Sequence, residues 1–95
     1  MATIDGKVTL ASLGGLYKIV VGSDAVTGSV ASLDTGLSTI VFAAACVMHA
    51  NQDANDAGYC TVDHGADGLL DVYAWDDAGA AATNENTVYV IAIGK

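Results

Sequence analysis

Two cysteines and two histidines are the residues best suited to metal chemistry in this chain of 95 residues. Cys46 and His49 lie close together in the sequence, as do Cys60 and His64, and thiolate and imidazole groups are the usual ligands of zinc. If residues 46–49 form a strand, however, Cys46 and His49 point to opposite faces of it. We therefore expect free, buried thiols, histidines at loop edges, and no metal or other cofactor.

Acidic residues form three further candidates for chemistry. The stretches 53–58 (DANDAG) and 63–68 (DHGADG) resemble fragments of a calcium loop, but neither has the glutamate that closes such a loop. Asp and Asn are also natural turn residues, so we interpret both stretches as solvated turns. The side chains of the adjacent pair Asp76 and Asp77 diverge if they end a strand, which does not suit acid–base chemistry. With no nucleophile beside a base and an orienting group, the sequence predicts a protein that is not an enzyme.

Aromatic residues offer a possible binding platform. Tyr73 and Trp75 share one face of the alternating stretch 69–75, and Tyr89 joins them if the last strand lies alongside. Such a platform is able to stack a sugar ring. Packing in a core or an interface is the alternative, and the small number of aromatic residues in the chain favours it.

Composition and charge exclude several classes of partner. The net charge is -8, and the three basic residues are all lysines, so nucleic acid and anionic membrane surfaces are not expected partners. The apolar run near Ile40 is too short to span a bilayer, and no basic region precedes an apolar stretch as in a secretory signal. Hydrophobic residues make up 53% of the chain and charged residues only 15%, which points to apolar surface covered by an oligomeric partner.

Short apolar runs separated by Gly, Asn, Asp and Ser indicate the fold class. We expect an all-β protein, an antiparallel β-sandwich or a jelly-roll-like barrel of about six to eight short strands. An N-terminal arm or leading strand over residues 1–15 would precede a single β-sandwich domain over residues 16–95. The strands are expected at 8–10, 16–21, 25–31, 38–48, 59–63, 69–75 and 87–93, with turns that include 22–24, 33–36 and 64–68.

The run from Ser38 to Met48 is the most unusual of these strands, because neither of its faces is polar. Three consecutive alanines leave a helix as the alternative, although the β-branched residues favour a strand. If the run forms a hairpin with 59–63 centred on Asp53, then Cys46 lies opposite Cys60. A strand that is apolar on both sides must be covered on both sides. Either a neighbouring subunit or the N-terminal arm would cover the second face.

The subunit interpretation predicts a set of interface residues from the central run and the last strand. Homo-oligomer contacts are expected at Ile40, Phe42, Ala44, Val47, Tyr89 and Ile91.

The order of these segments resembles a known class of proteins. A strand (VTGSVA) is followed by Thr35-Gly36-Leu37-Ser38-Thr39-Ile40, a long apolar strand, an alternating strand that ends in an aromatic residue (LLDVYAW), an Ala/Thr loop and TVYVIAIG. Over about Val26 to Gly94, this order is similar to that of small structural proteins of tailed bacteriophages, including capsid decoration (cement) proteins and the small β-domains of head or tail fibres. The shortness of the chain suits a decoration protein better than a fibre.

The resemblance implies a viral structural protein, made in the host cytoplasm and placed on the outer surface of the capsid in the virion. It would be a homotrimer that stabilises the phage head by clamping neighbouring major capsid proteins. The alternative is a head or tail fibre β-domain that binds host-surface glycans. The arm would contact the capsid protein through Thr3, Ile4, Val8 and Leu10.

Overall fold

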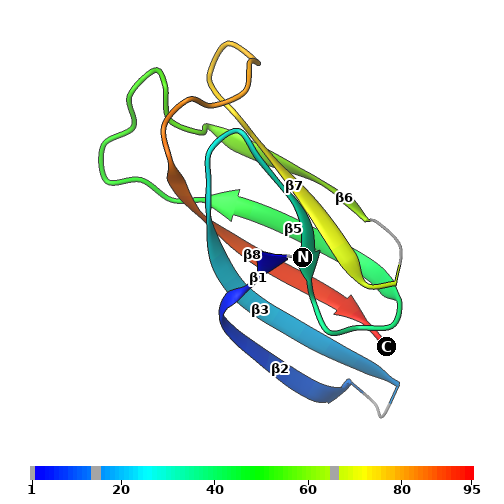
Figure 1. Cartoon of the computed structure of the whole chain (residues 1–95). Coiled ribbons are helices and arrows are strands. Elements are labelled where there is room, and N and C mark those ends of the chain that lie inside the picture. The colour runs from blue at the N-terminus through cyan, green and yellow to red at the C-terminus, as the bar shows by residue number, and fades with distance from the viewer. Residues whose placement is uncertain (1, 14–15, 65–66) are drawn as a thin grey trace.

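The computed structural model describes residues 2–13, 16–64 and 67–95, with side chains from residue 4 to 10 and from 16 onward within those ranges. All of the regular structure in this part of the chain is β (Figure 1). The strands are β1 (Ala2–Thr3), β2 (Asp5–Leu13), β3 (Tyr17–Val26), β4 (Ser29–Asp34), β5 (Ile40–Val47), β6 (Tyr59–His64), β7 (Leu69–Trp75) and β8 (Asn86–Gly94).

The strands form two four-stranded sheets packed face to face, which confirms the predicted all-β sandwich. One sheet has the order β1-β4-β7-β6 and the other β2-β3-β8-β5. All pairings are antiparallel except the short one between β1 and β4. The central run forms strand β5, so the strand interpretation of this segment is confirmed and the helix alternative is wrong.

The core lies between the sheets and consists of the inward-facing residues of the central strands. Along β8 every second residue is buried, as period-two alternation requires. The largest fully buried side chains are those of Leu33, Leu70, Val20, Val26, Val72, Val88 and Thr35. Because most of these residues are β-branched or small, the core is thin, and it covers only one face of each sheet.

The predicted turn at Gly22–Asp24 is wrong, because β3 runs straight through these residues. A side chain at Gly22 would collide with Ile4 and lie 2.8 Å from the Asp5 carbonyl oxygen. Glycine is therefore needed here for the close approach of the neighbouring segment and not for a turn. The chain reverses at Gly28 instead, whose φ of 78° lies in the left-handed region.

The predicted hairpin between the central run and 59–63 is also wrong. Strand β5 pairs with β8, and β6 pairs with β7 in the other sheet, so Cys46 lies opposite Tyr89 and Cys60 opposite Ala74. The eleven-residue link between β5 and β6 is long enough to carry the chain from one sheet to the other. In Figure 1 this green link projects at the end where β5 finishes.

The N-terminal segment is part of the sandwich. Strand β2 pairs with β3 along the edge of the sheet opposite to β5. It therefore does not fold over the outer face of β5, which removes one of the two coverings that the sequence allowed. Ile4 is 6% exposed and belongs to the core.

The connection from β4 to β5 is fixed by hydrogen bonds of the Thr35–Thr39 segment. The Thr35 hydroxyl donates to the Gly68 carbonyl at 2.5 Å and accepts from the Leu37 amide at 3.2 Å. The Ser38 amide and hydroxyl both donate to the Lys95 carbonyl, at 2.6 and 2.8 Å. This segment therefore ties the β6–β7 turn and the chain beyond β8 to one corner of the sandwich.

Candidate functional site: an apolar sheet face

The outer side of the sheet β2-β3-β8-β5 is the most unusual surface of the described chain. Residues that lie opposite one another on neighbouring strands share a face, so the strand register arranges the outward side chains in three rows across the sheet. The rows are Asp5–Ser23–Tyr89–Cys46, Val8–Val21–Ile91–Ala44 and Leu10–Ile19–Ile93–Phe42. We call this set the apolar face; Asp5, at one corner, is its only charged residue.

The apolar face is open to solvent in the isolated chain. Val8 is 50% exposed, Leu10 56%, Phe42 54% and Tyr89 45%. Antiparallel sheets with one free face normally carry polar residues there. A contiguous apolar surface of this kind marks a site of interaction with another molecule.

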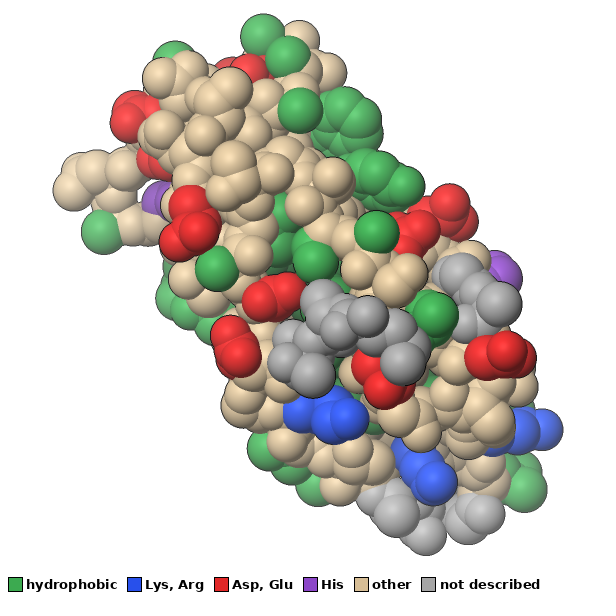
Figure 2. Space-filling model, viewed as in Figure 1, with side chains coloured by type: hydrophobic (Ala, Val, Ile, Leu, Met, Phe, Trp, Pro, Cys, Tyr) green, Lys and Arg blue, Asp and Glu red, His purple; other side chains and the backbone are tan. Residues whose placement is uncertain are grey.

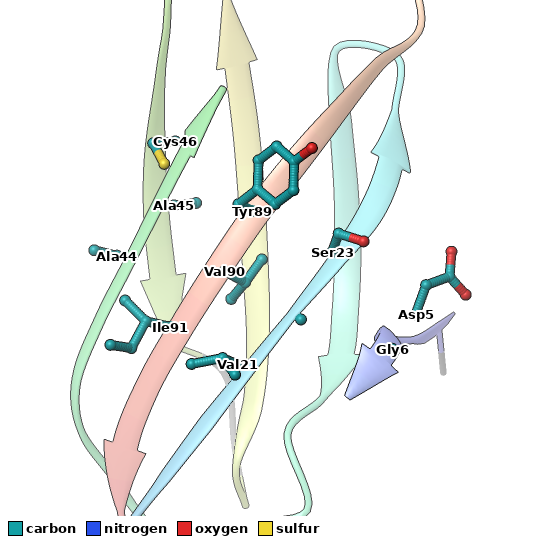
Figure 3. A pocket seen from close by; sticks show the side chains of 11 residues that line it. Asp5, Gly6, Val21, Ser23, Ala44, Ala45, Cys46, Tyr89, Val90 and Ile91 are labelled. Atoms are coloured by element: carbon teal, nitrogen blue, oxygen red, sulfur yellow. The ribbon is translucent and has the colours of Figure 1, made fainter. Parts of the chain in front are cut away.

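Part of the apolar face is hollowed. A depression of about 520 Å³ lies over the first two rows, and the small residues Ser23, Ala44 and Cys46 contribute to its lining. Tyr89 and Ile91 border it from β8, and Figure 3 shows the Tyr89 ring rising between β5 and β3. The third row has a large apolar side chain on every strand, so the face is low at one end and raised at the other.

Four of the six predicted interface residues, Phe42, Ala44, Tyr89 and Ile91, belong to the apolar face. The other two, Ile40 and Val47, pack against the core. Assigning them to the same surface was wrong for two reasons. Val47 has the opposite strand parity, and a register shift between Ile40 and Phe42 reverses the alternation at the start of β5.

The predicted capsid-contact arm divides in the same way. Val8 and Leu10 lie on the apolar face. Ile4 is buried against β3, so its assignment to an exposed contact was wrong. The Thr3 backbone pairs with Asp34, and its side chain lies outside the described part of the chain.

Sequence reasoning missed Ile19, Val21 and Ile93 as members of this surface. The signal was available, because the stretches IVV and VYVIAI are apolar at both parities. That pattern indicates strands with an apolar residue on each face.

The opposite sheet carries a different feature on its outer side. The rings of Tyr73 and Trp75 are stacked with centroids 6.3 Å apart, and Trp75 Nε1 donates to the Thr61 hydroxyl at 2.8 Å. Tyr59 lies opposite Trp75 and is 50% exposed. Figure 2 shows hydrophobic side chains along the edge formed by β6 and β7. The predicted third member, Tyr89, lies on the other sheet, so that part of the prediction was wrong.

The cysteines and histidines considered as candidate zinc ligands do not converge in the structure. Cys46 lies on the apolar face, His49 Nε2 donates to the Ala57 carbonyl at 2.7 Å, and His64 pairs with Leu70 at the far end of β6. Burial, with a smaller effect of the neighbouring Cys46, raises the pKa of the Cys60 thiol. Among the described residues, no group of three or more His, Cys, Asp or Glu side chains is arranged to hold a metal ion.

The first calcium-like stretch, residues 53–58, forms a set of hydrogen bonds that we call the clamp, because it joins two loops. The Asp56 carboxylate accepts from the Asp53 amide at 3.0 Å and from the side-chain amides of Asn84 and Asn86 at 3.0 and 3.1 Å. These bonds, the Asp53 amide first, lower the pKa of Asp56 to about 2. The clamp joins the β5–β6 link to the loop before β8. The second stretch includes residues 65 and 66, which lie outside the described residues.

The two adjacent carboxylates serve local structure. Asp76 accepts hydrogen bonds from the backbone amides of Ala78 and Ala80, at 2.9 and 3.0 Å, as expected for a turn residue. Asp77 accepts one from the Gln52 side chain at 2.8 Å. The two carboxylates therefore have separate hydrogen-bond partners and do not form a joint acid–base pair.

Comparison with protein-family models, curated proteins and solved structures finds no match to this chain. No helix long and apolar enough to cross a bilayer occurs in the part of the chain that the structure describes.

Proposed function

We propose that this protein is a structural subunit of a virion, a capsid decoration protein that stabilises a phage head by clamping neighbouring major capsid proteins. The observation that carries the proposal is the apolar face, a broad surface with a single charged residue, Asp5 at one corner, on a small and strongly acidic chain. Such a surface is suited to assembly and not to chemistry. The segment order shared with small phage structural proteins supplies the partner class.

A decoration protein works by binding alone. A subunit that binds the assembled shell but not its separated parts stabilises the shell by mass action. The high net negative charge keeps free subunits soluble before they assemble. In Figure 2 the lysines gather at the lower end of the molecule, and acidic side chains are scattered over the rest of the visible surface.

Strand β2 provides the proposed contact with the capsid protein. It forms an edge of its sheet, and its residues from Asp5 to Leu10 are exposed. The backbone groups along its outer edge are free to pair with a strand of another protein, which is a common mode of peptide recognition. This replaces the free arm expected from the sequence by a strand that is already ordered.

Co-sedimentation with capsids of the tailed phage that encodes the chain tests the function. We expect the protein to pellet with expanded heads and to raise the temperature at which they open. Native mass measurement should show a gain in multiples of 9.5 kDa per particle. An acidic protein of similar size serves as the control. Protein that stays in the supernatant at saturating concentration would contradict the proposal.

A second candidate function, the glycan-binding domain of a head or tail fibre, is favoured by the aromatic pair of β7. The stacked rings of Tyr73 and Trp75, with Tyr59 beside them, supply ring faces for a sugar. The hydrogen bond from the Trp75 indole N–H to the Thr61 hydroxyl fixes the orientation of the indole. A glycan array tests it with Trp75→Ala and, as a control on the other sheet, Tyr89→Ala. A signal lost only in Trp75→Ala supports glycan binding, and no signal in the wild type contradicts it.

A further inference from the structure

We infer that the apolar face packs against the same face of a second copy of this chain. The twofold axis that relates the two copies lies in the contact between their apolar faces and runs perpendicular to the strands. The inference concerns contact between copies and stands whether or not the larger partner is a capsid.

Charge selects the kind of partner. Apart from Asp5 at one corner, the apolar face has no ionised group, so it presents nothing to attract a basic or acidic protein. In a twofold self-contact, residue i of one copy meets residue j of the other and j meets i, so every ionised group on the face would need an opposite charge on that same face. A copy of this chain offers a surface of matching chemistry, while its acidic residues stay outside the contact.

Shape selects the arrangement. The row Leu10–Ile19–Ile93–Phe42 is raised, and the depression of about 520 Å³ occupies the two rows beyond it. An axis across the strands turns one copy end for end. The raised row of each copy then enters the depression of the other, and Phe42 of one copy faces the region around Ala44 and Cys46 of its partner. The contact fills the space that a flat apolar partner would leave empty.

Symmetry argues for two copies and against the trimer implied by the family resemblance. A twofold contact joins a patch to itself, whereas a closed ring of three joins two different patches on each subunit. The apolar face is one continuous surface, and the outer side of the other sheet carries Asp63, Asp71 and Thr61 in equivalent positions. The two sides are therefore unlike, and only the apolar face is self-complementary.

The size of the face suits a pair that forms at high protein concentration. Four strands about 4.8 Å apart, and three rows about 6.8 Å apart along the strands, give a flat area of about 390 Å². The relief of the side chains increases the accessible area above this value. Two such faces bring the total buried area toward the roughly 1,000 Å² that a specific interface needs.

Analytical ultracentrifugation of the full chain tests the pairing. At about 0.1 mM the wild type should sediment as a dimer, twice the 9.5 kDa chain mass. Ile91→Asp, at the centre of the face, should raise the dissociation constant at least ~100-fold. Ser29→Asp, an exposed strand position on the other sheet, is the matched control and should remain dimeric. Circular dichroism confirms that each variant is folded. If Ile91→Asp does not fold, Leu10→Asp on the exposed edge strand replaces it with the same expectation.

A bump-exchange experiment tests the arrangement. Ala44→Phe fills the depression and should weaken the pair about tenfold or more, because the raised row of the partner no longer fits. Adding Phe42→Ala to the same chain removes the large side chain at position 42 of the partner that would collide with the new phenylalanine at position 44. The double variant should therefore recover most of the lost affinity. A wild-type monomer or trimer, a dimer unaffected by Ile91→Asp, or a double variant weaker than Ala44→Phe would overturn the inference. Capsid co-sedimentation is scored separately, so a failure of the proposed function is distinguishable from a failure of the pairing.

Discussion

The hydroxyl of Thr35 offers a sharp test of how the sandwich corner is held. Thr35 is 1% exposed, and its hydroxyl both donates to the Gly68 carbonyl and accepts from the Leu37 amide. Thr35→Val keeps the branched shape and removes both bonds. Thr35→Ser keeps the hydroxyl and removes one methyl group. The pair of variants therefore separates hydrogen bonding from packing at one buried position.

The expected magnitudes follow from these contacts. Losing the bond to Gly68 costs about 1 kcal/mol, and the carbonyl still accepts the Thr35 amide at 3.3 Å. The Leu37 amide loses the hydroxyl acceptor in a buried setting, which costs about 1 to 2 kcal/mol more. Thr35→Val should therefore lower the free energy of unfolding by about 2 to 3 kcal/mol. Thr35→Ser should lower it by about 1 kcal/mol, the value of a buried methyl group.

Urea unfolding followed by circular dichroism measures both variants, at one fixed protein concentration because self-association adds to the apparent stability. For a domain of this size the Thr35→Val loss corresponds to a fall in Tm of about 10 to 20 °C. The m-value should stay unchanged, since the fold is the same. A Thr35→Val protein at least as stable as Thr35→Ser would refute the assigned hydrogen bonds.

Four further predictions follow from the same structure. The lowered pKa of Asp56 adds stability that is complete above about pH 4 and lost as pH falls toward about 2, so urea titrations should show the wild type losing more stability than Asp56→Asn between pH 5 and pH 3. Gly68→Ala should cost at least about 2 kcal/mol in the same assay, because φ is 79° and the new methyl group would collide with the Leu37 carbonyl. Ala45→Asp puts a charge toward the core and should yield insoluble or unfolded protein, whereas Ala44→Asp on the outer side should give a soluble, folded monomer on size exclusion. EDTA should leave Tm unchanged in a thermal scan, and a fall of several degrees would indicate a bound cation.

The fold class could be predicted from the sequence because alternation, β-branched residues and turn residues act locally. Strands β5, β6, β7 and β8 fall within a few residues of their predicted positions. What could not be predicted is which strands pair. Glycine is typical of turns, so Gly22 was assigned to one. Its actual role is to let Ile4 approach the backbone of β3 closely. That contact joins segments distant in sequence, which a local pattern does not show.

The apolar face could be predicted only in part, for a related reason. An apolar run such as VYVIAI shows that both faces of a strand need covering, but does not show which residues face the core. Parity fixes that only when the register is known, and the shift at the start of β5 moved Ile40 to the inner side. The aromatic group failed similarly, because Tyr89 and Trp75 belong to strands in different sheets.

The position of β8 has a consequence for how the chain folds. It pairs on one side with β3 and on the other with β5, yet it is the last of these strands to be synthesised. Until it arrives, β3 and β5 each expose an unsatisfied edge and an apolar surface, so the nascent protein passes through a state that is prone to aggregation. Insertion of this one strand closes the sheet and the core together, which makes folding an all-or-none event that depends on long-range contacts and is correspondingly slow.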